Sequence, residues 1–183
     1  DWDGLPNRRS ELIKQLKDVE NVLAITGDIH AFFAGTPWAK DDPSVKLPEF
    51  VTGAVSSNTY QRLLANTAAS DPALAAAGAE ELALLIKTFL EDPVLLPNPH
   101  LAHVDVTHHG FAVVELSSSS AIVTFYVIPQ TKVVEDLGSD PAILDESLTL
   151  SRFRVNTGSR ELFGEIDGEW SRWNPDSSEF EGA

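Results

Sequence analysis

The sequence predicts an α/β fold with a sheet packed between other layers. Residues 7–19 place Leu12, Ile13, Leu16 and Val19 at helical spacing, which indicates an amphipathic helix. The next residues, 22–25, form a short run of branched apolar residues that is typical of a fully buried strand. A later run, residues 121–128, is largely apolar at both odd and even positions, as in a strand covered on both faces.

The amino-terminal part of the chain adds one loop and one more strand to this prediction. Asn7, which follows a proline, is a candidate cap for the first helix. Residues 31–48 show no period and contain several prolines, so we expect a loop with an aromatic cluster, formed by Phe32, Phe33 and Trp38. Residues 49–55 predict a second buried strand. It runs into Ser56-Ser57-Asn58, which suits either a hydrogen-bonded turn or a site for a metal or a phosphate oxygen.

The middle of the chain predicts one long helix. Asp71 is a favourable cap and Pro72 suits the first turn, and apolar residues follow at helical spacing. Pro93 cannot continue a helix, so we expect the end near Glu91. A short apolar run, residues 94–96, comes next.

The second half predicts antiparallel strands. Residues 112–116 and 121–128 are joined by a serine-rich turn, which indicates a hairpin. Residues 131–147 are acidic and loop-like, and residues 148–155 alternate as a strand does. The tail from Gly164 carries two tryptophans and many acids, and it is compatible with lying along a surface or with partial disorder.

Composition limits the class of protein. A chain of 183 residues with 43% hydrophobic and 22% charged residues is ordinary for one globular domain. No apolar run reaches the roughly 20 residues that a membrane-spanning helix needs. The net charge of −15 argues against a nucleic-acid partner, because phosphate backbones select basic surfaces.

Two amino acids are missing from the sequence. Without cysteine, the chain offers no disulfide, zinc knuckle or thiol nucleophile. Without methionine, even at position 1, we expect that an amino-terminal part has been removed from the primary translation product. The dinucleotide-binding, nucleotide-binding and serine-hydrolase motifs, and the zinc motif of metalloproteases, are absent as well.

The most informative local pattern is Asp28-x-His30 directly after the first predicted strand. A carboxylate and an imidazole at a strand end suit cations such as iron, zinc, manganese or calcium. The alternative is that Asp28 is a turn residue and His30 a partly buried histidine. Four further histidines precede the hairpin, and they indicate either a metal site or exposed loop imidazoles: His100, His103, His108 and His109.

Five segments in a fixed order resemble one family. They are WDG (2–4), GDIH (27–30), FVTGAVSS (50–57), NPHLAHVD (98–105) and HHGFAVVEL (108–116). Together they resemble the carboxy-terminal half of alkaline phosphatase D, the PhoD-like metallophosphoesterases, which include a phospholipase D branch. The resemblance covers residues 1–128.

The resemblance implies a fold, a chemistry and a set of site residues. The fold is a two-sheet metallophosphoesterase sandwich flanked by helices (α/β/β/α), of which this chain would be half. The chemistry is secreted, metal-dependent hydrolysis of phosphomonoesters and phosphodiesters with iron(III) and calcium. The resemblance makes Asp28 and His30 metal ligands and places Asp3 and His109 near the reacting groups. Phe111 stands where the family usually has Tyr, so a hydroxyl contact to substrate is expected to be missing.

The resemblance also implies a partner. The family's other ligands, including a cysteine, come from an amino-terminal half, so we expect an amino-terminal chain of the same precursor beside this one. We divide this chain into residues 1–130, part of the catalytic domain, and an acidic extension, residues 131–183. The substrate would be a phosphate ester, including a phospholipid if residues 32–38 or the tail approach an apolar substituent. The alternative hypothesis is a non-catalytic scaffold or regulatory module, because fold does not fix function.

Overall fold

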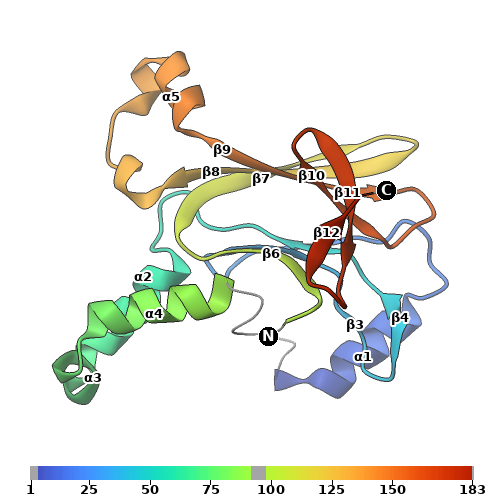
Figure 1. Ribbon diagram of the computed structural model, residues 1–183, viewed down its shortest axis with the longest axis horizontal. Helices are drawn as coiled ribbons and strands as arrows, with labels where there is room; N and C mark the ends of the chain where they lie inside the picture. Colours follow the sequence, from blue (N-terminus) through green and yellow to red (C-terminus); the bar gives the residue numbers. More distant parts are fainter. Residues whose placement is uncertain (1–3, 92–97, 183) are drawn as a thin grey trace.

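The computed structural model describes residues 4–91 and 98–182. Within them the chain forms a four-stranded sheet, a six-stranded sheet and a two-stranded sheet, together with five α-helices (Figure 1). The prediction of a mixed α/β fold is therefore confirmed.

The four-stranded sheet has the order β1-β5-β2-β6. Its strands are β1 (Ala24–Thr26), β5 (Glu49–Val51), β2 (Phe32–Gly35) and β6 (Leu101–Asp105). β1 and β5 are parallel, whereas β2 is antiparallel to both β5 and β6. β6 therefore runs in the same direction as β1 and β5, and the carboxyl ends of these three strands meet at one edge of the sheet.

The six-stranded sheet is an antiparallel meander. Its strands follow one another in space as they do in the sequence: β7 (His108–Leu116), β8 (Ser120–Pro129), β9 (Thr149–Asn156), β10 (Leu162–Ile166), β11 (Glu169–Asn174) and β12 (Glu179–Glu181). Short turns join most of these strands, so most pairs are local in sequence. The longest connection, between β8 and β9, carries the small helix α5 (Pro141–Ser147) (Figure 1).

The two large sheets share one hydrophobic core. The ring of Phe32 in β2 lies 5.3 Å from that of Phe125 in β8, and the ring of Phe50 in β5 lies 6.2 Å from that of Phe153 in β9. Further apolar residues of both sheets complete the same cluster, including Ala34, Val123, Val155, Leu162 and Trp173. The sheets are thus packed on each other, while the complete α/β/β/α arrangement of a metallophosphoesterase stays a prediction.

The other helices lie on the side of the four-stranded sheet (Figure 1). They are α1 (Pro6–Gln15), α2 (Tyr60–Ser70), α3 (Pro72–Ala76) and α4 (Ala79–Glu91). α1 packs on the two-stranded sheet of β3 (Trp38–Ala39) and β4 (Asp42–Lys46), where Ile13 is buried against Ala39 and Leu47. None of the described helices is long and apolar enough to cross a membrane.

The first helix and the first strand differ from the prediction. Asn7 is not the cap: the helix begins at Pro6 with Leu5 before it, because proline at the first position needs no amide donor and has a suitable φ. The first strand is not fully buried either. β1 is an edge strand of its sheet, and the side chain of Ile25 remains 55% exposed.

The predicted loop at residues 31–48 is wrong, because it contains strands β2, β3 and β4. Strand β2 lies inside the sheet, and Phe32 is fully buried against the second sheet. The segment therefore lacks the alternation of polar and apolar residues that marks a half-exposed strand in a sequence. The same burial overturns the idea that Phe32 approaches an organic substituent of the substrate. Trp38 is half-buried, and its ring contacts that of His100 edge-on.

The predicted helix after Asp71 exists but is divided. The Asp71 carboxylate accepts hydrogen bonds from the amides of Ala73 and Leu74, which confirms the cap. Gly78, with φ of 91°, then separates α3 from α4. The preceding helix α2 was not predicted, and the apolar run 94–96 lies outside the described residues.

The predicted hairpin and the strand at residues 148–155 are confirmed as β7, β8 and β9, and β7 begins earlier, at His108. The tail is paired as β10, β11 and β12 in the same sheet. Trp173 is buried in the shared core, and its indole Nε1 donates a hydrogen bond of 3.0 Å to the carbonyl of Pro99. The division of the chain at residue 130 stays a prediction, but residues 149–181 complete the sheet that residues 108–129 begin.

Candidate active site

Three strand-end loops lie together at one edge of the four-stranded sheet. They are residues 27–30 after β1, residues 52–59 after β5 and residues 106–107 after β6, which lead directly into β7. Backbone hydrogen bonds join them: the amide of Thr52 donates to the carbonyl of Thr26 at 3.0 Å, and the amide of Gly110 donates to that of Ala54 at 3.1 Å. This is the edge where carboxyl ends of parallel strands form a crevice in α/β proteins.

The amino terminus of α2 ties two of these loops to each other. The amide of Tyr60 donates to the carbonyl of His30 at 2.9 Å, and the next amide, of Gln61, donates to the carbonyl of Val106 at 3.1 Å. Thr59 is the cap of this helix and is almost fully buried. The loop with Asp28 and His30 and the turn after β6 are therefore neighbours.

The two predicted metal ligands share an unusual backbone conformation. The φ angles of Asp28 and His30 are 75° and 62°, in the left-handed region that side chains other than glycine adopt at a cost. Two such residues within three positions indicate that the surrounding contacts hold this loop in a strained form. Strain of this kind concentrates at binding and catalytic sites.

The orientation of the His30 ring follows from one hydrogen bond. Its Nδ1 lies 2.5 Å from the carbonyl oxygen of Asn58. A carbonyl oxygen only accepts, so Nδ1 carries the proton and the Nε2 atom of the neutral ring is the lone-pair donor. Histidines that bind metals are typically fixed in this way by a backbone carbonyl or carboxylate on the other nitrogen. Asp28 is exposed, so its carboxylate is accessible at the same edge.

These two side chains fit part of a metal site. A carboxylate and an imidazole are suitable donors for iron, and a carboxylate is suitable for calcium. Within residues 4–91 and 98–182, however, no three metal-capable side chains of His, Cys, Asp or Glu gather as one group. The described part of the chain therefore offers a pair of donors at this edge.

His109 lies next to this edge but is buried. Its exposed fraction is 3%, and its Nδ1 has no hydrogen-bond partner among the described residues. Burial lowers the pKa of His109, a hydrogen bond to the carbonyl of Ala54 opposes this shift, and the nearby charge of His108 adds to it. The net effect favours the neutral form of the imidazole. The following Gly110 has φ of 153°, and a Cβ there would collide with the carbonyl oxygen of Tyr126.

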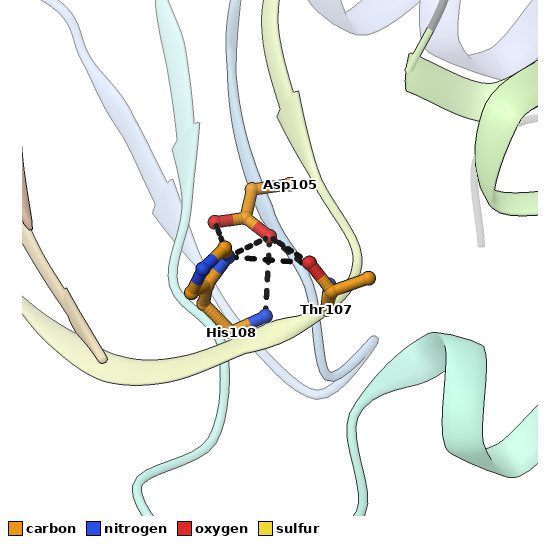
Figure 2. Close-up of polar contacts among 3 residues, drawn as sticks. All are labelled: Asp105, Thr107 and His108. Carbon is orange, nitrogen blue, oxygen red and sulfur yellow. Dashed lines mark hydrogen bonds and ion pairs between the residues drawn. The ribbon is translucent and has the colours of Figure 1, made fainter. Parts of the chain in front are cut away.

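A third polar group at the same edge is the cluster of Asp105, Thr107 and His108 at the β6–β7 turn (Figure 2). The sequence places His108 among four candidate histidines but does not indicate its pairing with Asp105. The Asp105 carboxylate accepts from the amides of Thr107 at 3.0 Å and His108 at 3.1 Å, and from the Thr107 hydroxyl at 3.2 Å. It also pairs with the His108 ring, whose Nδ1 lies 2.8 Å from Oδ2. A sequence signal for this turn does exist. Aspartate side chains commonly accept hydrogen bonds from backbone amides two and three residues later, as Asp105 does from Thr107 and His108.

The electrostatics of Asp105 follow from these contacts. Burial alone would raise the pKa of this carboxyl group, because it disfavours the charge. Hydrogen bonds from His108 and Thr107, together with the charge of His108, outweigh burial and lower the pKa of Asp105 to about 2. Asp105 is therefore ionised at every physiological pH.

The remaining predicted residues lie elsewhere. Asp3 lies outside the described residues. Phe111 stacks on Tyr126 with ring centroids 5.1 Å apart. His100 lies beside Trp38, and His103 lies between the sheets against Phe125 and Phe153. The histidines therefore do not form one cluster.

Comparison with known proteins gives one finding. Neither the comparison with curated proteins nor the comparison with solved structures yields a significant match. The family model of the PhoD-like phosphatases matches residues 1–125, which include all three strand-end loops described above. Since this match covers more than half of the chain, the protein belongs to the PhoD-like phosphatase family.

Proposed function

We propose that this chain supplies part of the active site of a metal-dependent phosphoric ester hydrolase, with Asp28 and His30 as metal ligands. Membership of the PhoD-like phosphatase family indicates hydrolysis of phosphate esters in general. The observation that carries the metal proposal is the fixed ring of His30, whose Nδ1 donates to the carbonyl of Asn58 so that Nε2 can bind a cation. The strained backbone at both ligands adds support.

The ions we propose are iron(III) and calcium, as the family resemblance implies. When bound, they supply positive charge that stabilises the phosphoryl oxygens during ester cleavage. The Asp28 carboxylate and His30 Nε2 would hold them from this chain. The loop backbone keeps His30 in place, because the amide of Tyr60 donates to the carbonyl of His30.

Two ligands are too few for such a site, and we propose that an amino-terminal chain of the same precursor provides the others. Apolar side chains exposed around the proposed ligands support this: Ile25, Ile29 and Val55 are 55%, 38% and 66% exposed. Strand β1 pairs with β5 and with no other described strand, so one of its edges is available for pairing. A second chain covering this region would bury these residues and complete the ligand set.

The substrates we propose are phosphomonoesters and phosphodiesters outside the cell, with a phospholipid as one candidate diester. The test uses the complete phosphatase, with this chain paired to its amino-terminal portion. Its metal content and its hydrolysis of 4-nitrophenyl phosphate, bis(4-nitrophenyl) phosphate and a phosphatidylcholine vesicle are measured.

Asp28→Ala and His30→Ala should each lower metal affinity and ester hydrolysis, by roughly a hundredfold or more. The matched control is Asp167→Ala, because Asp167 also has a positive φ, of 52°, but lies in the β10–β11 turn. Unchanged metal content in Asp28→Ala would reject the proposal. Hydrolysis of only one type of ester would define the preferred substrate.

A scaffold or regulatory role is the second candidate. It is favoured by the lack of a third metal-capable side chain near Asp28 and His30 within the described residues. The discriminating measurement is the activity of the amino-terminal portion without this chain. Full activity there would select the scaffold role.

A further inference from the structure

We propose that His108 is the proton donor to the leaving group in this hydrolysis and that Asp105 is its positioning residue, an inference that rests on the proposed function. Asp105 is the last residue of β6 and His108 is the first residue of β7, and neither is one of the metal ligands proposed above. Figure 2 shows the His108 ring against the Asp105 carboxylate, which also accepts the backbone amide of His108.

The contact with Asp105 fixes which nitrogen of His108 exchanges its proton. An ionised carboxylate only accepts hydrogen bonds, so the Nδ1 atom at 2.8 Å from Oδ2 must be the donor. The low pKa of Asp105, about 2, keeps the carboxylate in this form. Proton gain and loss therefore occur at Nε2, and the carboxylate favours the doubly protonated ring that a general acid needs.

The position of the turn suits this role. Val106, next to Asp105, accepts from the amide of Gln61, and His30 accepts from the adjacent amide of Tyr60. The proposed acid and the proposed metal ligand thus flank the same helix start. The side chain of His108 is 34% exposed and that of Asp105 only 12%, so the imidazole can reach a substrate while its carboxylate partner stays mostly shielded.

The other two histidines at this edge are less suitable. His30 already donates from Nδ1 to the carbonyl of Asn58, and its Nε2 is assigned to a metal. His109 is 3% exposed, and burial lowers its pKa, so it stays neutral. The Asp105 carboxylate pairs directly with the His108 ring, and a positive charge on His108 lowers the pKa of the neighbouring His109.

The proposed step balances as follows. Water adds to phosphorus, and its proton passes to solvent. The P–O bond to the leaving group breaks, with its electron pair on the leaving oxygen. The Nε2 proton of His108 moves to that oxygen and gives the free alcohol, and the neutral imidazole then regains a proton from solvent. The products are the alcohol and a phosphate with one ester bond fewer.

The test compares two esters in the complete phosphatase. An alkyl phosphate needs protonation of its leaving alkoxide, whereas 4-nitrophenolate leaves readily without it. His108→Gln should lower kcat for the alkyl ester by about a hundredfold, the usual contribution of a general acid, and should lower kcat for the 4-nitrophenyl ester by less than about threefold. His100→Gln is the matched control, because His100 precedes the opposite end of β6 from Asp105.

A second variant tests the positioning role. Asp105→Asn keeps an oxygen that accepts from the amides of Thr107 and His108, so the turn is expected to persist. It removes the negative charge beside the His108 ring. The alkyl-ester rate should fall about tenfold, and the pH above which this rate declines should move to lower values.

Each outcome decides the proposal. Equal losses on both esters, or no loss on either, would overturn the role of His108 while leaving the proposed hydrolase intact. A wild-type protein that binds metal but hydrolyses neither ester would overturn both. An unshifted pH profile in Asp105→Asn would overturn the positioning role alone. Circular dichroism and the urea midpoint of each variant establish that the comparison is made between folded proteins.

Discussion

The two large sheets share a core but differ in how their strands end. The four-stranded sheet is built from strands of three to five residues in mixed directions, and its strand ends lead into loops with strained residues such as Asp28 and His30. The first three strands of the six-stranded sheet are eight to ten residues long, with regular antiparallel pairing. The loop after the first strand of the smaller sheet carries Asp28 and His30, whereas His108 and His109 begin β7 of the larger sheet.

The junction between the sheets is therefore informative. β6 belongs to the first sheet and β7 to the second, and residues 106–107 alone separate them. The Asp105–His108 pair and the buried His109 lie at this junction. Loops allow polar groups to converge there, while the packed sheets on both sides limit their movement.

The largest expected effect comes from breaking the shared core. Phe125→Ala should lower the free energy of unfolding by about 3 to 5 kcal/mol, because it leaves a cavity among Phe32, Phe153 and His103. Urea unfolding should show one transition for both sheets. Leu116→Ala, at a side chain that is 76% exposed, should change stability by less than about 0.5 kcal/mol. Two separate transitions would mean that the sheets are independent.

The next effect concerns the junction itself. Gly110→Ala should lower the free energy of unfolding by more than about 2 kcal/mol, because alanine disfavours φ of 153° and its Cβ would collide with the carbonyl of Tyr126. Gly138→Ala is the control, since no atom lies within 4 Å of its added Cβ. Equal stability of the two variants would contradict the close approach of β7 and β8 at this point.

Asp105 should make stability depend on pH in the acid range. Its folded pKa of about 2 lies below the usual 3.8, so the unfolded chain binds more protons between these values. The contribution, about 2 kcal/mol, is present above the usual value and is lost as pH falls through the folded pKa. Urea midpoints of wild type and Asp105→Asn, measured at several pH values, should converge on acidification. A constant difference would argue against the ionised pair.

The smallest expected change in stability is at Asp28, where one substitution can distinguish backbone strain from metal binding by the carboxylate. Asp28→Gly should keep or raise stability, by at most about 1 kcal/mol, because glycine accepts the φ of 75° more easily. Metal binding should nevertheless be lost with the carboxylate. Asp167→Gly, at φ of 52° in the second sheet, should have a similar effect on stability and none on metal binding. A large loss of stability in Asp28→Gly would show that the carboxylate has a structural role.

Sequence patterns predicted the regular sheet better than the irregular one. The hairpin of β7 and β8 and the strand β9 follow from alternation and a serine-rich turn, which are local signals. Strands β2 and β6 were missed because their environment comes from residues distant in the sequence. Phe32, for example, packs against Phe125, and no periodic pattern of apolar residues near Phe32 indicates that contact.

The candidate site shows the same limit. Asp28 and His30 stood out because they directly follow an apolar run, and a family resemblance supported them. The Asp105–His108 pair did not stand out, since it forms only when the β6–β7 turn brings the two side chains together. That His109 is buried, and therefore neutral, likewise follows from the contact of residues 109–110 with Ala54 and not from its neighbours in the sequence.

The pairing of β2 with β6 has a kinetic consequence. It joins Phe32 to Asp105, with helices α2, α3 and α4 in the intervening chain. Closing such a long loop costs conformational entropy before the β2–β6 contacts can form and stabilise it. The hairpins of the second sheet close over short loops, at a lower entropic cost. We therefore expect the six-stranded antiparallel sheet to form early in folding and the edge with Asp28 and His30 to assemble late. Amide hydrogen exchange during refolding should protect β7 and β8 before β2 and β6.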